Sequence, residues 1–323
     1  MKKILIFGVS GNIGGYAVDY FLNMKMRDFE IVGADIVQSE YIRYSKIDFV
    51  RVDIGNKEEF DKLPKEEIYA VIDLIGPMPA RMIGYHPDEY VSINILGSFN
   101  IFQYAVNVHA DRILYAKSFC DILKRADTQL VLHVDDPPLF DYGDYHAVYC
   151  VSQNSAMELL KCIHRFYGIK TFIFRLPHIY LWSRNDKYSV KGVPHKMMHR
   201  ILIDQATEGK VIEVWGDAER KKDMVYVKDF CQILFKASFI DRKEGFYNVG
   251  TGIGISLLDQ IKGIVEVFAE KRKSDIVFCP DKPNAPQYIM DIKETVEELG
   301  YAPQYGYIDM LKDMKTERKL DRF

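Results

Sequence analysis

The chain has 323 residues, which at about 150 residues per domain corresponds to roughly two domains and leaves ample length for a buried core. Hydrophobic residues make up 48% and charged residues 28%, with only 21 Gly and 12 Pro, so a disordered or fibrous protein is excluded. The 43 basic and 46 acidic residues leave a net charge of −3, which gives no reason to expect nucleic acid or an anionic membrane as a partner.

In the first half of the chain, short β-branched runs alternate with longer helical patterns, which is typical of a parallel sheet with crossover helices. Strands are predicted at residues 3–7, 30–34, 49–52, 70–74, 112–116 and 170–175. Helices are predicted at residues 14–26, 88–107 and 149–166. We therefore predict an α/β fold in which residues 1–175 form a Rossmann-type, doubly wound parallel sheet.

The alternation ends after Arg175, where prolines and glycines interrupt the pattern. Residues 176–323 are predicted to form a smaller C-terminal α/β lobe that binds substrate. A strand at residues 245–250 could return to the first sheet, which would assign residues of about 223–252 to the first domain. The chain ends in a charged helix, residues 308–322, whose charged face we expect to be solvated.

Three spaced glycines follow the first predicted strand, at Gly8, Gly11 and Gly14, and open directly into a helix. Such a turn lets a pyrophosphate approach the backbone, and the first N–H groups of the helix, near Asn12 and Ile13, can bind the phosphates. The pattern therefore predicts a dinucleotide-binding turn.

Asp35 follows Gly14 by 21 residues and ends the second predicted strand. A carboxylate at this place accepts hydrogen bonds from the adenosine ribose and repels a 2′-phosphate, so NAD is predicted in preference to NADP. Arg43 is the alternative, as a partner for such a phosphate, although a solvated loop arginine is the simpler interpretation.

The five cysteines form no CxxC pair, so no disulfide framework or zinc site is predicted. The first apolar run ends at Gly8, too early for a signal peptide, and no run reaches the length of a membrane span. His195 and His199 have i, i+4 spacing, but no third ligand is evident, so a surface helix without metal is predicted. We expect a cytoplasmic protein with no metal site and no contact with membranes.

Beyond the glycine turn, ordered blocks over nearly the whole chain resemble the extended short-chain dehydrogenases/reductases, specifically the nucleotide-sugar epimerases and dehydratases. The blocks are residues 52–54, which include Asp53 and Ile54, 87–97, 113–118, 149–153, 175–180, 215–229 and 247–252. The resemblance implies that Asp53 and Ile54 lie at the adenine and that Ser118 and Tyr149 are catalytic. It also implies that His178 and Lys222 bind substrate.

Several positions depart from the family pattern. Gln153 stands where the family has the lysine of its Tyr-x-x-x-Lys motif, and Lys222 replaces an arginine. Leu181 replaces a glycine, and residues 73–76 replace a His-Leu-Ala-Ala segment. Gln153 keeps the reach needed to hydrogen-bond the nicotinamide ribose but cannot stabilise a tyrosine phenolate by charge.

Other groups were weighed against these assignments. Lys117 is predicted to face away from Ser118, because neighbouring strand residues point to opposite faces. Tyr145 is the rival base to Tyr149, and Arg175 is at least as well explained by a structural ion pair as by substrate binding. Asn94 is expected to organise the backbone around the site.

The resemblance implies an enzyme, an NAD-dependent epimerase or dehydratase of a nucleoside-diphosphate sugar that acts through transient hydride transfer to bound NAD. Epimerisation is favoured because no acidic residue directly follows Ser118; Asp121 comes three residues later. Two alternatives remain, a catalytically impaired NAD-binding regulatory or scaffold protein and a reductase of a non-nucleotide carbonyl compound. A homodimer is expected by resemblance, through the helices at residues 88–107 and 149–166, with outer faces that hold Phe102, Val106, Met157 and Leu160. The alternative is that these four residues belong to the core of a single chain.

Overall fold

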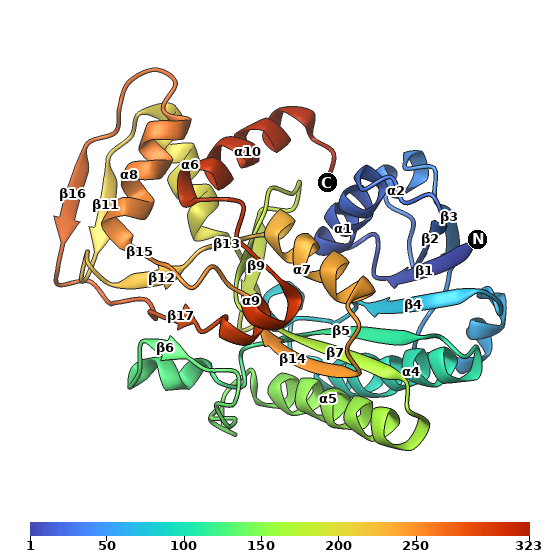
Figure 1. Cartoon of the computed structure of the whole chain (residues 1–323). Helices are drawn as coiled ribbons and strands as arrows, with labels where there is room; N and C mark the ends of the chain where they lie inside the picture. Colours follow the sequence, from blue (N-terminus) through green and yellow to red (C-terminus); the bar gives the residue numbers. More distant parts are fainter.

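A seven-stranded parallel sheet forms the centre of the computed structural model, which describes residues 1–323 (Figure 1). In chain order its strands are β1 (Lys2–Phe7), β2 (Phe29–Asp35), β3 (Asp48–Arg51), β4 (Ile68–Asp73), β5 (Arg112–Ser118), β7 (Lys170–Leu176) and β14 (Glu244–Asn248). Their spatial order is β14-β7-β5-β4-β1-β2-β3. The order reverses between β1 and β4, and in such sheets ligands bind at the carboxyl ends of the strands beside the reversal.

Two apolar clusters cover the two faces of the sheet. Alternate residues of β1 divide between them, because Ile4 and Ile6 belong to one cluster and Leu5 and Phe7 to the other. Helices α1 (Asn12–Asn23) and α7 (Val227–Phe239) pack together on the first face, and α4 (Ser98–Asn107) and α5 (Ala147–Tyr167) lie on the second (Figure 1). The predicted doubly wound fold is therefore confirmed.

The prediction that the apolar residues of α4 and α5 lie on outer faces of these helices is wrong. Phe102, Met157 and Leu160 are buried in the second cluster, and Val106 is half-buried against it. These side chains fill the space between the two helices and the sheet, so they present no apolar surface to another molecule.

The helix predicted at residues 88–107 has an irregular start. It comprises α3 (Pro87–Glu89), the π-helical segment η3 (Tyr90–Gly97) and α4. Asn94 lies in the π segment, is buried, and donates from Nδ2 to Ser152 Oγ on α5 at 3.0 Å. This bond ties the π segment to the neighbouring helix.

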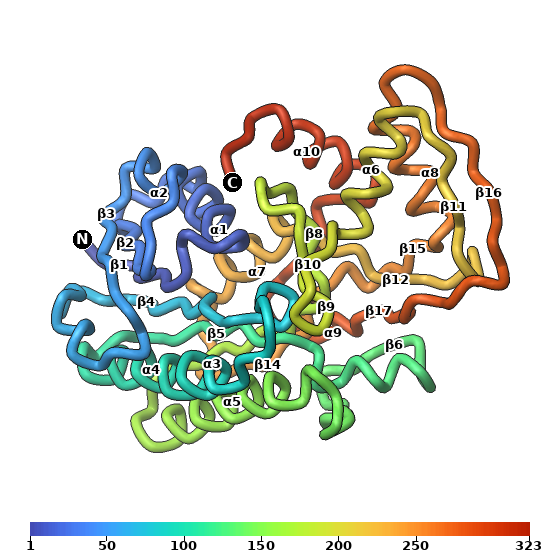
Figure 2. Tube along the Cα trace, turned by 180° about the vertical axis from the view of Figure 1, so that it is seen from behind, coloured from blue at the N-terminus to red at the C-terminus, as the bar shows by residue number.

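The C-terminal lobe combines helices with short two-stranded sheets (Figure 2). Its main helices are α6 (Met198–Glu208), α8 (Leu257–Phe268) and α10 (Tyr307–Leu320). The strand pairs are β8 (Ile179–Tyr180) with β13 (Val225–Tyr226), β9 (Lys187–Val190) with β10 (Val193–Lys196), β11 (Ile212–Trp215) with β16 (Ile276–Cys279), β12 (Lys221–Asp223) with β15 (Gly254–Ser256), and β6 (Val131–Leu132) with β17 (Ile289–Met290). Outside the lobe, the short helices are α2 (Glu40–Tyr44), η1 (Lys57–Lys62), η2 (Pro79–Arg81) and η4 (Leu123–Asp127). The lobe itself contains the short helix α9 (Lys293–Leu299).

The chain crosses between the two parts more than once. The expected strand near residue 245 is β14, which lies at the edge of the main sheet beside β7. At the end of the chain, the Phe323 ring stacks on Tyr16 of α1 with ring centroids 3.9 Å apart. The domain boundary at residue 175 stays a prediction.

Two expectations about the lobe need correction. The charged helix α10 is not simply a solvated surface, because Glu317 is buried and pairs with Lys228 and Arg322. His195 and His199 do not share a helix, since His195 lies in β10 and His199 in α6. No helix of the structure is both long and apolar enough to cross a bilayer.

Candidate active site

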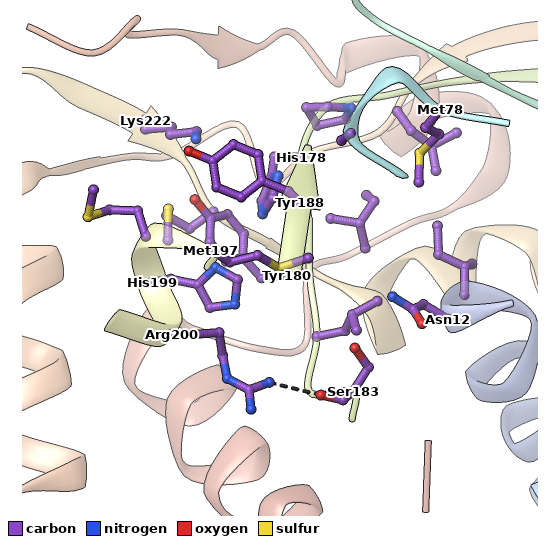
Figure 3. Close-up of a pocket in the computed structure, with 18 of the residues that line it drawn as sticks. Asn12, Met78, His178, Tyr180, Ser183, Tyr188, Met197, His199, Arg200 and Lys222 are labelled. Carbon is purple, nitrogen blue, oxygen red and sulfur yellow. Dashed lines mark hydrogen bonds between the residues drawn. The ribbon is translucent and has the colours of Figure 1, made fainter. Parts of the chain in front are cut away.

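A cavity of about 550 Å³ lies between the carboxyl edge of the sheet and the C-terminal lobe. It extends from Asn12 and Ile13 at the start of α1, past Ser118 and Tyr149, to Lys222 on β12. The cavity therefore joins the predicted cofactor turn to the predicted catalytic and substrate-binding residues. Figure 3 shows Asn12 at the first of these and His178 and Lys222 at the last.

The glycine turn brings α1 into close contact with β1. Gly8 has a φ of +85°, a backbone conformation that residues other than glycine rarely adopt. A Cβ atom on Gly14 would lie 2.0 Å from the carbonyl oxygen of Gly8, so only glycine fits there. Gly11, which directly precedes α1, provides no side-chain cap, and this leaves the N-terminus of the helix available to an anionic group.

Asp35 is fixed at the end of β2 by backbone groups. Its Oδ2 accepts from Ser10 N at 3.0 Å and its Oδ1 from Ile36 N at 2.7 Å. Burial raises the pKa of Asp35, and these hydrogen bonds oppose the increase. The carboxylate is thus oriented beside the glycine turn, where the predicted ribose contact requires it.

Asp53 and Ile54 lie beyond β3 and do not line the cavity. Asp53 Oδ1 accepts from Gly55 N at 2.9 Å, and Ile54 is buried, with its carbonyl oxygen accepting from Asn100 Nδ2 at 2.9 Å. Both sit at the carboxyl end of the strand next to β2, as the adenine end of a dinucleotide requires. The close-packed turn, the uncapped helix and the oriented Asp35 therefore fit an adenine dinucleotide.

Ser118, Tyr149 and Gln153 meet at the middle of the cavity. Ser118 ends β5, and its backbone N–H donates to Gln153 Oε1 at 3.0 Å. Burial raises the pKa of Tyr149, the neighbouring Cys120 adds to the increase, and the Ser118 hydroxyl opposes it. The three residues are thus brought together, but without a positive charge of their own.

The two predicted alternatives near Tyr149, the cation Lys117 and the base Tyr145, are engaged elsewhere. Lys117 Nζ binds Asp121 Oδ2 at 2.6 Å and Asn154 Oδ1 at 2.7 Å, inside the protein. The rival base, Tyr145, donates its hydroxyl to the carbonyl oxygen of Gly84. Neither side chain is available to assist or replace Tyr149.

Polar but uncharged groups surround Gly76 at the end of β4. A Cβ atom there would lie 3.2 Å from Asn94 Oδ1 and 3.4 Å from Gln153 Nε2. Asn94 Oδ1 is buried without a hydrogen-bond partner, and so is Oδ2 of Asp73. Buried polar atoms of this kind are uncommon in proteins and often mark functional sites.

The lobe side of the cavity carries three rings that pack edge to face. The His178 centroid lies 4.6 Å from that of Tyr180 and 6.0 Å from that of His199. Lys222 Nζ lies 5.8 Å from the centre of the Tyr180 ring (Figure 3). Desolvation and Lys222 lower the pKa of His178 well below its usual value, and desolvation lowers that of His199 to about 4, so both rings are neutral at pH 7.

The cavity wall is basic. No Asp or Glu lines the cavity. Six Lys and Arg residues do: Arg81, Lys117, Arg200, Arg220, Lys221 and Lys222. The sequence pattern points to only two of these residues, Lys117 and Lys222. A chain with slightly more acidic than basic residues therefore gathers positive charge around this cavity.

Two of the arginines near the site are held by the protein. Arg200 lies 3.3 Å from the centre of the Trp182 ring and donates to the Ser183 carbonyl oxygen at 2.9 Å (Figure 3). Arg175 does not line the cavity, because it lies 3.7 Å from Asp121 and donates to the carbonyl oxygen of Val134 at 3.0 Å. These contacts favour a structural ion pair for Arg175 over substrate binding.

Comparison with known proteins supports the same interpretation. The model of the NAD dependent epimerase/dehydratase family matches residues 4–250. The chain is 26% identical over 318 residues to a putative UDP-glucose 4-epimerase of Methanocaldococcus jannaschii, covering 97% of this chain and 96% of the relative.

Two solved structures share the fold over their whole length. The UDP-glucose 4-epimerase of Thermotoga maritima, solved with UDP-glucose, has a TM-score of 0.78 at 19% identity and covers 98% of this chain and 99% of its own. The UDP-N-acetylglucosamine 4-epimerase of Bacillus cereus has a TM-score of 0.79 at 18% identity and covers 100% of both chains.

Proposed function

Because this chain belongs to the NAD-dependent epimerase/dehydratase family, we propose that it epimerises a nucleoside-diphosphate sugar with NAD bound across the glycine turn. One observation carries the substrate class: no carboxylate lines the cavity beyond that turn, and of the six Lys and Arg residues that do, only Lys117 is paired with a carboxylate. A diphosphate needs such a surface, whereas a neutral carbonyl compound does not.

In this proposal the protein binds and orients the sugar and moves one proton. Lys222 attracts the diphosphate, and His178, neutral in the cavity, hydrogen-bonds the sugar. Ser118 orients the reacting hydroxyl, and Tyr149 takes its proton and later returns it. NAD, when bound, would supply the oxidant and then the reductant for the reacting carbon.

The absence of a carboxylic acid from the cavity wall favours epimerisation over dehydration. Loss of water from a sugar needs a proton donor beside the departing hydroxyl group. Asp121, the acidic residue nearest to Ser118 in sequence, is buried and bound to Lys117 at 2.6 Å, so it does not face the cavity. The neighbouring wall offers no other Asp or Glu for this role.

A second candidate function rests on Gln153. Its amide replaces the cation that would favour a Tyr149 phenolate, and burial raises the pKa of that tyrosine. A protein that binds NAD and a sugar nucleotide without turning the sugar over would have this arrangement. Turnover separates the two functions, because binding alone is common to both.

The test begins with the purified protein, whose bound nucleotide is released and identified by mass spectrometry. The NAD-loaded protein is then incubated with a panel of UDP- and dTDP-sugars, and products are followed by proton NMR. Formation of an epimer without net NADH supports the proposal. Net NADH consumption with a carbonyl compound would instead indicate a reductase, and binding without conversion would indicate the second candidate.

We also propose a cytoplasmic homodimer. All five cysteines are free, as in a reducing compartment. Because the expected outer-face residues are buried, the dimer contact is assigned to the exposed Val91 and Leu96 of η3 and Val151 of α5. Light scattering on the protein and on a Leu96→Glu variant tests this, with a monomeric variant expected.

A further inference from the structure

Arg81 is a cation in the cavity wall without a protein partner. It ends η2 in the segment after β4, is half-buried, and lines the cavity. No carboxylate forms a salt bridge with its guanidinium, and its side chain makes no hydrogen bond. Burial lowers its pKa, as expected for a charge that is partly desolvated and uncompensated. A guanidinium in this position is poised to receive an anion from a ligand.

The segment that carries Arg81 is held in place from two sides. Gly84 N donates to Gly192 O at 3.2 Å, and strand β9 packs against η2. On the other side, the Tyr145 hydroxyl donates to the Gly84 carbonyl oxygen. Arg81 is therefore presented by a braced segment, so that little ordering is required when a ligand binds.

The position of Arg81 is close to the proposed reaction centre. Its neighbour Met82 packs in a small apolar cluster with Tyr90 and Tyr149. Arg81 and His178 line the same cavity, as do Tyr149 and Ser118. Arg81 thus belongs to the part of the cavity where the sugar ring would lie.

A separate group of cations serves the lobe side. Lys221 and Lys222 lie in β12, Arg220 directly precedes it, and all three line the cavity. In the proposed function the diphosphate lies at Lys222, on this side of the cavity. Arg81 comes from the segment after β4 and is therefore available to another anionic group of the same ligand.

We propose that Arg81 binds a carboxylate on the sugar, so that the preferred substrate is a nucleoside-diphosphate uronic acid. This inference rests on the proposed function and narrows its substrate. The planar guanidinium can bind both oxygens of a carboxylate at once, which a neutral hydroxymethyl group at the same position cannot match.

Calorimetry of the NAD-loaded protein with UDP, UDP-glucose and UDP-glucuronate tests the proposal. We expect UDP-glucuronate to bind about tenfold or more tightly than UDP-glucose, as is reasonable for one charge-assisted bidentate contact. Arg81→Gln should abolish this preference and leave UDP binding unchanged. Arg81→Lys should keep part of the preference, because it retains the charge without the fork.

The matched control is Arg27→Gln, which removes an exposed arginine that does not line the cavity. Equal affinity of the unaltered protein for the two sugars would overturn the proposal. So would an equal loss of affinity for all three ligands in Arg81→Gln, which would make Arg81 a diphosphate ligand. If neither UDP nor either sugar nucleotide binds the unaltered protein, the proposed function itself fails.

Discussion

The two ends of the cavity use different physical means. At the cofactor end, Gly8 and Gly14 shape the backbone, and two backbone N–H groups orient Asp35. This end therefore depends on the path of the main chain. At the reaction end, Tyr149 and Ser118 are in place, but the neighbouring side chain is the uncharged Gln153. The difference teaches that cofactor binding and proton transfer can vary separately within one fold.

Replacement of Tyr149 by phenylalanine should break the reaction end alone. Without the phenol, we expect kcat to fall by about 10²- to 10⁴-fold, the usual contribution of a positioned acid or base. NAD affinity, measured by calorimetry, should be unchanged, since Tyr149 lies away from the glycine turn. A variant that retains full turnover would show that another group moves the proton, and Tyr145→Phe is the matched control.

Replacement of Gly14 by alanine should break the cofactor end. The added Cβ would lie 2.0 Å from Gly8 O, so α1 must shift away from β1. We expect NAD affinity to fall about 100-fold and the free energy of unfolding to fall by about 1–3 kcal/mol, as for an overpacked core. The control is Gly143→Ala, whose Cβ meets Asp141 Oδ1 at an ordinary 3.4 Å. Unaltered NAD binding in Gly14→Ala would contradict the assignment of the turn.

Replacement of Gln153 by lysine should supply the positive charge that the reaction end lacks. An ammonium beside Tyr149 lowers the pKa of the phenol, and each unit corresponds to about 1.4 kcal/mol. We expect kcat to rise about tenfold and the pH-rate profile to move toward lower pH. Gln153→Met, which keeps the length without a charge, should produce neither change. If lysine leaves the protein without turnover, the function that only binds its ligands is favoured.

The smallest expected effect is on the pH dependence of stability, and it comes from Asp73, the last residue of β4. Complete burial raises its pKa to about 7, while a hydrogen bond from Ile75 N opposes the increase. The folded protein therefore holds this proton more tightly than the unfolded chain, whose aspartates have a pKa of about 3.9. The resulting stability is present below about pH 4 and is lost as the pH rises through about 7, at up to about 1.4 kcal/mol per pH unit.

Asp73→Asn should flatten this dependence. Urea unfolding of both proteins at pH 5, 6 and 7.5 would measure it, with the largest gain of the variant at the highest pH. The exposed Asp61, replaced in the same way, is the control. Parallel curves for the unaltered protein and Asp73→Asn would show that the carboxyl group is ionised throughout.

The sequence predicts the sheet well because its strands are buried and are separated by helices with clear periodicity. The predicted strand at residues 30–34 lies inside β2 (Phe29–Asp35), and that at residues 170–175 lies inside β7 (Lys170–Leu176). The lobe is harder, since strands such as β8 (Ile179–Tyr180) have only two residues and pair with distant segments. So short a strand carries no periodic signal.

The candidate site shows the same division. The glycine turn and Asp35 follow a fixed spacing along the chain, so the sequence alone predicts them. Arg81 and His199 have no such spacing, and only the folding of distant segments brings them into the cavity wall. For Phe102 the sequence leaves a dimer contact and a place in the core both open, because periodicity identifies an apolar stripe without showing what covers it; the structure buries it in the core.

The π-helical segment η3 (Tyr90–Gly97) has a consequence for the length of this part of the chain. A π turn accommodates more residues than an α turn over the same rise, as after the insertion of a residue into a regular helix. Deleting Ser92, an exposed residue of this segment, would favour regular α turns and rotate the helix on one side of the deletion by about 100° relative to the other. Asn94 would then leave its place beside Gly76 and Ser152, so the extra residue in the π segment fixes where this buried amide lies in the candidate site.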